Sequence, residues 1–150
     1  MKLPLQLLLA LTLSVFSCKK ASDNLIPATA TPTFDVKGVM ATGSWTVGSF
    51  RQRTEDKSSG FKGITFVFSA DGTVTATENN KTTKGTWVYS PAVTYYGGNG
   101  LSSLTINIGT SKPFDLLNAT WNINAASTTS GLKLDNKEPA EDEHVEFVRL

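Results

Sequence analysis

The sequence ITFVFSADGTVTAT, residues 64–77, decides the fold because it contains two alternating runs joined by a tight turn. Every second residue of its first run, residues 64–68, is large and apolar, and side chains alternate in direction along a strand. Asp71-Gly72 supplies the positive φ angles that a short hairpin needs. The stretch therefore predicts an antiparallel hairpin with one apolar face.

The same alternation continues on both sides of this hairpin. Residues 43–50 precede it, and the turn Asn79-Asn80 leads from it into residues 85–89. Further alternating runs are found at residues 104–108, 117–123, 131–134 and 145–150. Eight short antiparallel strands fit a sandwich or a barrel, and the mostly short connections favour the barrel. We therefore predict an all-β, eight-stranded antiparallel up-and-down β-barrel, whose interior is wide enough for side chains or one small ligand.

Length and charge limit the classes of function. A chain of 150 residues, 39% apolar and 18% charged, has room for one domain with a substantial core. Without the first 17 residues, which include Lys2, the side chains sum to about zero charge. A surface that binds phosphates needs a clustered basic excess, so we expect no nucleic-acid partner.

The N-terminus has the pattern of an export signal. Residues 3–16 are mostly apolar, follow Lys2, and are too few to span a bilayer. Val15-Phe16-Ser17-Cys18 resembles the bacterial lipobox, with Phe16 bulkier than usual. The resemblance implies a lipoprotein signal peptide over residues 1–17 and lipidation of Cys18 by acyl chains such as palmitate. Cys18 is the only cysteine, so an internal disulfide is excluded.

We expect these acyl chains to anchor the protein to a membrane of the cell envelope, the outer membrane, on its periplasmic or surface side. Residues 18–41 are then a lipidated flexible linker, because their composition cannot bury enough surface to order itself. The barrel domain covers residues 42–150. The apolar linker residues expected to pack on it are Phe34, Val36, Val39 and Met40.

Several short motifs resemble one known family. Gly43-Ser44-Trp45 resembles the glycine-any-tryptophan signature of the lipocalins, and Arg149 matches the cationic residue that packs over that tryptophan. The run from Phe66 to Thr73 and the motifs Gly85-Thr86-Trp87, Trp121-Asn122-Ile123 and Phe147-Val148-Arg149 are similar to those of lipocalin-like (calycin-type) domains in lipoproteins of Bacteroidetes-type bacteria. The resemblance covers residues 43–150. It implies a barrel closed at one end by Gly43, Trp45 and Arg149, where a guanidinium stacks on the indole.

The sequence contains no recognisable catalytic arrangement. His144 is the only histidine, and with Cys18 lipidated the chain lacks ligands for a transition metal. We expect His144 to be a solvated strand residue, and the acidic run around it to be a solvated loop and strand face. The run comprises Glu138, Glu141, Asp142, Glu143 and Glu146. We therefore expect a monomeric protein without enzyme activity, cofactor or metal. A hydrolase or inhibitor that uses loop residues has no motif to support it.

Two functions remain open. In the first, the barrel binds a small apolar or amphipathic ligand at its open end, with Tyr95 and Tyr96 in a glycine-flanked loop as candidate ligand-binding residues. In the second, the barrel is filled and docks to an envelope protein complex or a glycan. An interior filled by Phe66, Phe68, Trp87 and Ile106 would exclude the first reading.

Overall fold

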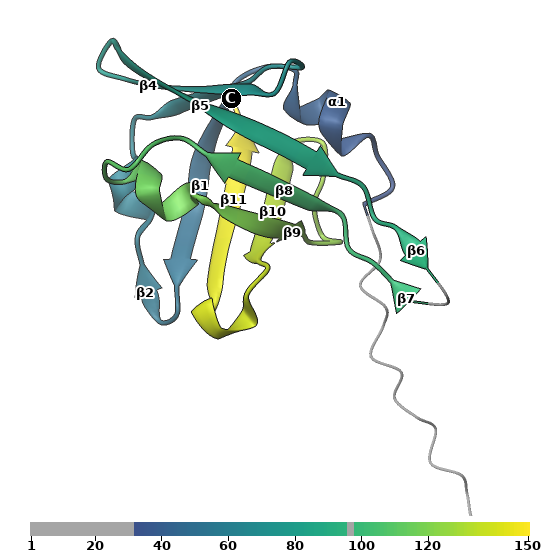
Figure 1. Ribbon diagram of the computed structural model, residues 1–150. Coiled ribbons are helices and arrows are strands. Elements are labelled where there is room, and N and C mark those ends of the chain that lie inside the picture. Colours follow the sequence, from purple (N-terminus) through teal and green to yellow (C-terminus); the bar gives the residue numbers. More distant parts are fainter. Residues whose placement is uncertain (1–31, 96–97) are drawn as a thin grey trace, which may run out of the picture.

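The computed structural model describes residues 32–95 and 98–150, which form an all-β barrel (Figure 1). Each barrel strand pairs antiparallel with the next along the chain, and the last strand pairs with the first, so the sheet closes on itself. This confirms the closed eight-stranded up-and-down barrel expected from the sequence. The barrel strands are β1 (Trp45–Gln52), β3 (Thr65–Phe68), β4 (Thr73–Glu78), β5 (Lys81–Ser90), β8 (Ser103–Asn107), β9 (Ala119–Ile123), β10 (Gly131–Asn136) and β11 (Glu143–Arg149).

Several strands begin one to four residues from the predicted position, and two of these differences have a clear cause. β5 begins at Lys81, four residues early, because Asn79 and Asn80 both have positive φ (47° and 64°) and form a tight turn that pairs Glu78 directly with Lys81. β9 begins only at Ala119, since the apolar residues before it form a short helix. Both differences arise in the connections.

The connections contain several short elements. β2 (Glu55–Asp56) pairs with the end of β1, and β6 (Thr94–Tyr95) pairs with β7 (Gly98–Asn99) in a separate small sheet. Three 3₁₀-helices follow strands: η1 (Ser58–Phe61), η2 (Phe114–Leu117) and η3 (Pro139–Glu141). No helix within residues 32–95 and 98–150 is long and apolar enough to cross a bilayer.

A helix that the sequence did not predict packs against the barrel. α1 (Val36–Met40) is capped by Asp35, whose carboxylate accepts a hydrogen bond from the backbone N–H of Gly38 at 3.0 Å. Val36 and Met40 are buried in the core, and Phe34 and Val39 are half-buried against it. The last residues of the expected linker therefore cover the barrel (Figure 1).

Aromatic rings fill the barrel interior. The rings of Phe66 and Phe68 meet the ring of Phe147 nearly edge to face, each at a centroid distance of 5.5 Å. Phe68 meets Trp87 in the same way at 5.7 Å, and Phe50 meets Trp121 at 6.1 Å. Edge-to-face packing suits the ring quadrupoles and adds about 0.5–1.5 kcal/mol per pair to area burial.

Both ends of the barrel are closed, and each tryptophan bonds to a segment at or near an end. We call the two ends of the barrel the Trp45 end, which α1 covers, and the Phe61 end, which η1 and η2 cover. The indole N–H groups of the three tryptophans donate to backbone carbonyls of Met40, Ser69 and Leu117, at 3.2, 2.8 and 3.0 Å respectively. Because a buried indole donor must be satisfied, each ring holds its connecting segment in place.

Candidate functional site

At the Trp45 end, the residues named from the lipocalin resemblance lie together. Trp45 is fully buried and pairs with Arg149, whose guanidinium carbon lies 5.3 Å from the centre of the indole. Arg149 Nη2 donates to the carbonyl oxygens of Thr42 at 2.6 Å and Val39 at 3.3 Å. Gly43 has a φ of +80°, and a Cβ there would lie 3.1 Å from Arg149 Nε. This arrangement closes the barrel at this end.

The residues predicted to bind a ligand or a lipid are only partly within the described chain. Tyr95 is the last residue of β6, in the small β6–β7 hairpin (Figure 1). Tyr96 and Cys18 lie outside the described residues. A binding role for the two tyrosines and lipidation of Cys18 therefore stay predictions.

The barrel interior is filled by the side chains that the sequence analysis named. Phe66, Phe68, Trp87 and Ile106 are each at most 3% exposed. The Phe61 end is plugged by Phe61, Phe114 and Leu117, which η1 and η2 carry. Binding of a ligand inside the barrel would require these side chains to move. The hollows considered next lie outside the barrel interior.

One such hollow lies between η1 and η2, above the plug. It has a volume of about 340 Å³ and is lined by Asp56, Lys57, Ser59, Gly60, Lys112, Pro113 and Leu116. Its floor is apolar, and its two amines already have carboxylate partners. Lys57 pairs with Glu55, and Lys112 Nζ lies 2.9 Å from Asp115 Oδ2. The groove therefore suits an uncharged or weakly polar group better than an anion.

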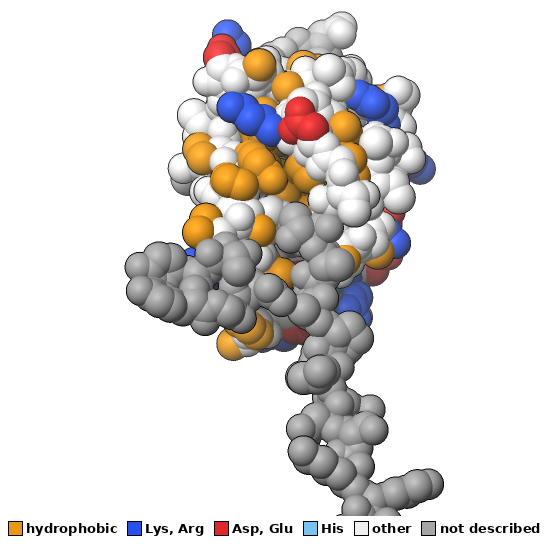
Figure 2. Space-filling model, turned by 90° about the vertical axis from the view of Figure 1, so that its right-hand side faces the viewer, with side chains coloured by type: hydrophobic (Ala, Val, Ile, Leu, Met, Phe, Trp, Pro, Cys, Tyr) orange, Lys and Arg blue, Asp and Glu red, His pale blue; other side chains and the backbone are white. Residues whose placement is uncertain are grey.

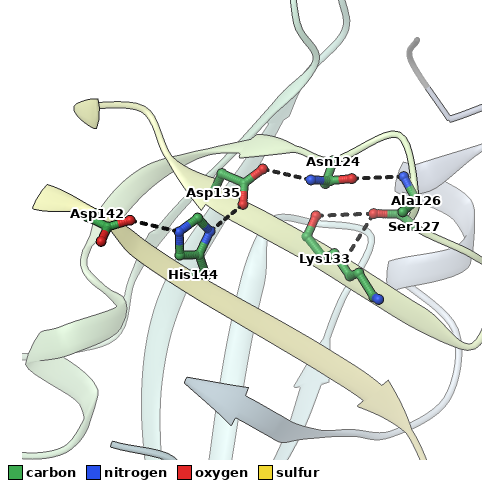
Figure 3. A network of polar contacts seen from close by, with 7 residues as sticks. All are labelled: Asn124, Ala126, Ser127, Lys133, Asp135, Asp142 and His144. Carbon is green, nitrogen blue, oxygen red and sulfur yellow. Dashed lines mark hydrogen bonds and ion pairs between the residues drawn. The ribbon is translucent and has the colours of Figure 1, made fainter. Parts of the chain in front are cut away.

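A second candidate is a polar network on the outer face of β10 and β11, centred on His144 (Figure 3). His144 Nδ1 lies 2.6 Å from Asp135 Oδ1, and its Nε2 lies 3.1 Å from Asp142 Oδ1. Only a doubly protonated imidazolium can donate to both carboxylates. The network continues from Asp135 Oδ2 to Asn124, whose amide nitrogen donates at 2.9 Å.

The surroundings of His144 favour its charged form. The hydrogen bond to Asp135 raises the pKa of His144 above its usual value, and the bond to Asp142 raises it further. Partial burial and the nearby Arg51 act in the opposite direction. His144 is thus a bonded link between β10, β11 and the turn after η3, which corrects the expectation of a simply solvated histidine.

Glu143, beside His144, corrects another expectation. Its side chain points inward at the Phe61 end and is 9% exposed, although the acidic run was expected to be solvated. Its two carboxylate oxygens accept hydrogen bonds from the amides of Gln52 and Asn136, both at 2.6 Å. Because these amides lie on the flanking strands, the buried carboxylate joins β1, β10 and β11 at this end.

The network offers no assembled catalytic group. Ser49 lines the same small hollow as His144, but the two ring nitrogens of His144 are directed at Asp135 and Asp142. Ser127 Oγ instead donates to the carbonyl oxygen of Lys133 at 3.1 Å. Among residues 32–95 and 98–150, no three histidine, cysteine or acidic side chains are grouped as metal ligands.

The sequence did not predict this network, because strand pairing brings its members together. Asp135 pairs with His144 across β10 and β11, and Asp142 reaches the ring from the turn before β11, where its φ is +47°. The signal available in the sequence was the acidic run. The choice of Asp135, which lies outside that run, depends on the register.

Figure 2 shows the side of the molecule on which α1 and the β6–β7 hairpin lie. Hydrophobic side chains gather at the middle of this side, with lysine or arginine and an acidic side chain above them. Partly buried residues packed against the core include Phe34 and Val39 near α1 and Tyr89 on β5. Val93, just before β6, is more exposed at 67%. The apolar surface here largely continues the packing of α1.

Comparisons with known proteins support the fold. No family model matches the chain, and no curated protein matches it. A crystal structure of a DUF4847 family protein from Bacteroides vulgatus ATCC 8482 is similar, with a TM-score of 0.52 and 19% sequence identity. The match covers 76% of this chain and 96% of that one. At this identity the likeness shows a shared fold, and the chain is a β-barrel similar to that of a DUF4847 family protein.

Proposed function

We propose that this protein is a non-enzymatic module of the cell envelope, held to the outer membrane by a lipidated Cys18, that acts through the outer surface of a filled barrel. The observation that carries the proposal is the packing of the interior. Phe66, Phe68 and Phe147 occupy the centre, and both ends are covered. A carrier of small ligands needs an internal cavity of about 300 Å³ or more, which this packing removes.

The experiment is native mass spectrometry of the full chain, extracted from membranes of its bacterial host in a non-ionic detergent. We expect the mass of residues 18–150 with covalently attached acyl chains and no non-covalent ligand. A small molecule released only when the protein unfolds would contradict the filled barrel. An unlipidated mass that begins at residue 1 would contradict the anchor.

A second candidate is binding of a small amphipathic ligand in the groove between η1 and η2. The observation that favours it is the apolar floor of Pro113 and Leu116 within a hollow of about 340 Å³. In the same mass spectra, this function requires a non-covalent adduct that disappears in the Leu116→Asp variant. Leu116 is only half-buried, so the substitution leaves the Phe61 and Leu117 plug in place.

A further inference from the structure

We infer that the outer face of strands β3, β4, β5, β8 and β9 is a binding surface for an uncharged polysaccharide. The inference rests on the proposed function, since it names the kind of partner that the outer surface of the filled barrel would take. We call this surface the threonine face. Its outward side chains are Thr65, Val67, Thr73, Thr75, Thr77, Thr82, Lys84, Thr86, Val88, Ser90, Ser103, Thr105, Asn107, Thr120 and Asn122.

Strand pairing arranges these side chains in regular cross-strand rows. Thr77 lies between Thr65 and Thr82, and the hydroxyl oxygens of Thr77 and Thr82 are 3.4 Å apart. Thr105 pairs with Thr120, with hydroxyl oxygens 3.0 Å apart. Strands β5, β8 and β9 of this face are nearest the viewer in Figure 1. The rows form a broad surface of hydroxyl and amide groups, each able to donate and accept hydrogen bonds.

The near absence of charge distinguishes this face. Threonine alone is unremarkable, because β-branched residues favour strands. Soluble proteins, however, usually place many charged side chains on their surface. Here Lys84 is the one ionisable residue among the outward positions, and the exposed pair Glu78 and Lys81 lies at the hairpin that joins β4 to β5. The outward positions of the remaining barrel strands include Lys133, Asp135, His144, Glu146 and Arg51. The charge is thus divided between two sides of one barrel.

The chemistry of the face selects the partner. Nucleic acid and anionic lipid need clustered cations, which the face lacks. Protein interfaces depend on tryptophan, tyrosine and arginine, whereas serine, threonine and valine contribute little. A neutral polysaccharide presents hydroxyls and apolar C–H faces, and the threonine face offers hydroxyls together with exposed Val67 and Val88 (38% and 58%). Charge and chemistry therefore match this class of partner.

Binding is tested by depletion of the full chain, in a polyoxyethylene detergent, on three neutral polysaccharides: cross-linked dextran, insoluble starch and insoluble mannan. Solid supports are chosen because many weak contacts add on a repeating polymer. We expect at least one support to deplete the wild-type protein from solution. The double variant Thr86→Lys/Val88→Lys should be retained at least roughly tenfold more weakly, because its lysines must be desolvated against a neutral surface. The double variant Ser49→Lys/Ala125→Lys adds the same charge on exposed sites elsewhere and should be retained like the wild type.

Three results would overturn the inference. They are no depletion of the wild type on any support, equal retention of both lysine variants, or retention only by an anionic control, cross-linked polygalacturonate. Size-exclusion chromatography tests for a fourth such result: a dimer that Thr86→Lys/Val88→Lys dissociates would show that a second copy of the chain, and not a polysaccharide, covers the face. Thermal melting confirms that each variant is folded. These results do not depend on whether Cys18 is lipidated or whether the barrel interior is filled. The proposed function can therefore stand if the inference fails.

Discussion

Single positions close the barrel through contacts with backbone as well as with other side chains. The indole of Trp45 bonds to the carbonyl of Met40, and the guanidinium of Arg149 bonds to the carbonyl of Thr42. Both contacts fix the segment that enters β1. The glycine-x-tryptophan motif and the last arginine, about one hundred residues apart, therefore work as one unit because β11 pairs with β1.

Trp45→Ala should lower the free energy of unfolding by about 3–5 kcal/mol, because it leaves a large cavity and frees the chain at Met40. Chemical denaturation followed by circular dichroism measures the change. Val88→Ala, which truncates an outward side chain that is 58% exposed, is the control and should change stability by less than about 0.5 kcal/mol. A loss below about 1 kcal/mol for Trp45→Ala would mean that the ring does not plug the barrel.

Gly85, in the Gly85-Thr86-Trp87 motif, allows close approach of two strands. A Cβ at this position would lie 2.5 Å from Ile108 Cα and closer still to the carbonyl oxygen of Asn107. Gly85→Ala should therefore cost about 3 kcal/mol, since backbone must shift. Gly63→Ala is the control: its φ is +83° but nothing lies within 4 Å, so only strain of about 1 kcal/mol applies. Equal losses in denaturation would show that crowding at β8 is unimportant.

At the scale of elements, short connecting segments close what the strands leave open. α1 covers the Trp45 end, while η1 and η2 insert Phe61, Phe114 and Leu117 at the other. The turn after η3 is held differently, by polar contacts. The backbone N–H of Arg53 donates to the carbonyl of Asp142 at 2.7 Å, and His144 bonds to its carboxylate.

The His144 link predicts a pH dependence of stability. The pKa of His144 is raised in the folded state, with 6.5 as the ordinary value, so the folded protein binds the proton on His144 more strongly than the unfolded chain does. The contribution is complete below about pH 6.5 and is lost as the pH rises through the folded pKa. Urea denaturation of wild type and His144→Gln at about pH 6 and about pH 8 should show a difference that shrinks at the higher pH.

The control for this prediction is Arg51→Gln, which removes the one nearby cation that opposes protonation of His144. We expect it to extend the pH range over which the wild-type link persists. A stability difference between wild type and His144→Gln that does not vary between the two pH values would contradict the imidazolium link. Because the His144 side chain is 39% exposed, solvent screening keeps the effect small.

At the scale of the whole molecule, the filled interior is the basis of the proposed role at the outer surface of the barrel. In that proposal, partners bind to the barrel walls, which differ in charge. If acyl chains hold the N-terminal side to a membrane, the barrel remains in the aqueous phase and can present the threonine face to a polymer there.

Cys18→Ser should release the protein from the membrane pellet into the supernatant and abolish incorporation of a labelled fatty acid, because serine cannot form the thioether that carries the acyl chains. Cell fractionation and labelling in the native host measure both. Ser17→Ala keeps a small residue before the cysteine and should behave like the wild type. Retention of Cys18→Ser in membranes, with no label in the wild type, would contradict lipid anchoring.

The sequence by itself determined the strands, because alternation and turn chemistry are local. The hairpin of residues 64–77 and all the other predicted runs are barrel strands. It also singled out Gly43, Trp45 and Arg149, which pairing of β1 with β11 places together. Burial of Glu143 and the link from His144 to Asp135 depend on register between distant strands, which no local pattern encodes.

Tertiary structure alone decided whether the barrel is hollow and which way its charges face. Alternation shows that Phe66 and Phe68 point inward, but whether they meet Phe147 and Trp87 depends on how the sheet closes. The plugs come from helices whose few residues have no periodic signal. The threonine face exists because five barrel strands, each paired with the next, lie side by side with their largely uncharged sides outward. Burial and surface chemistry are properties of packed neighbours, and packing is fixed by the closed sheet.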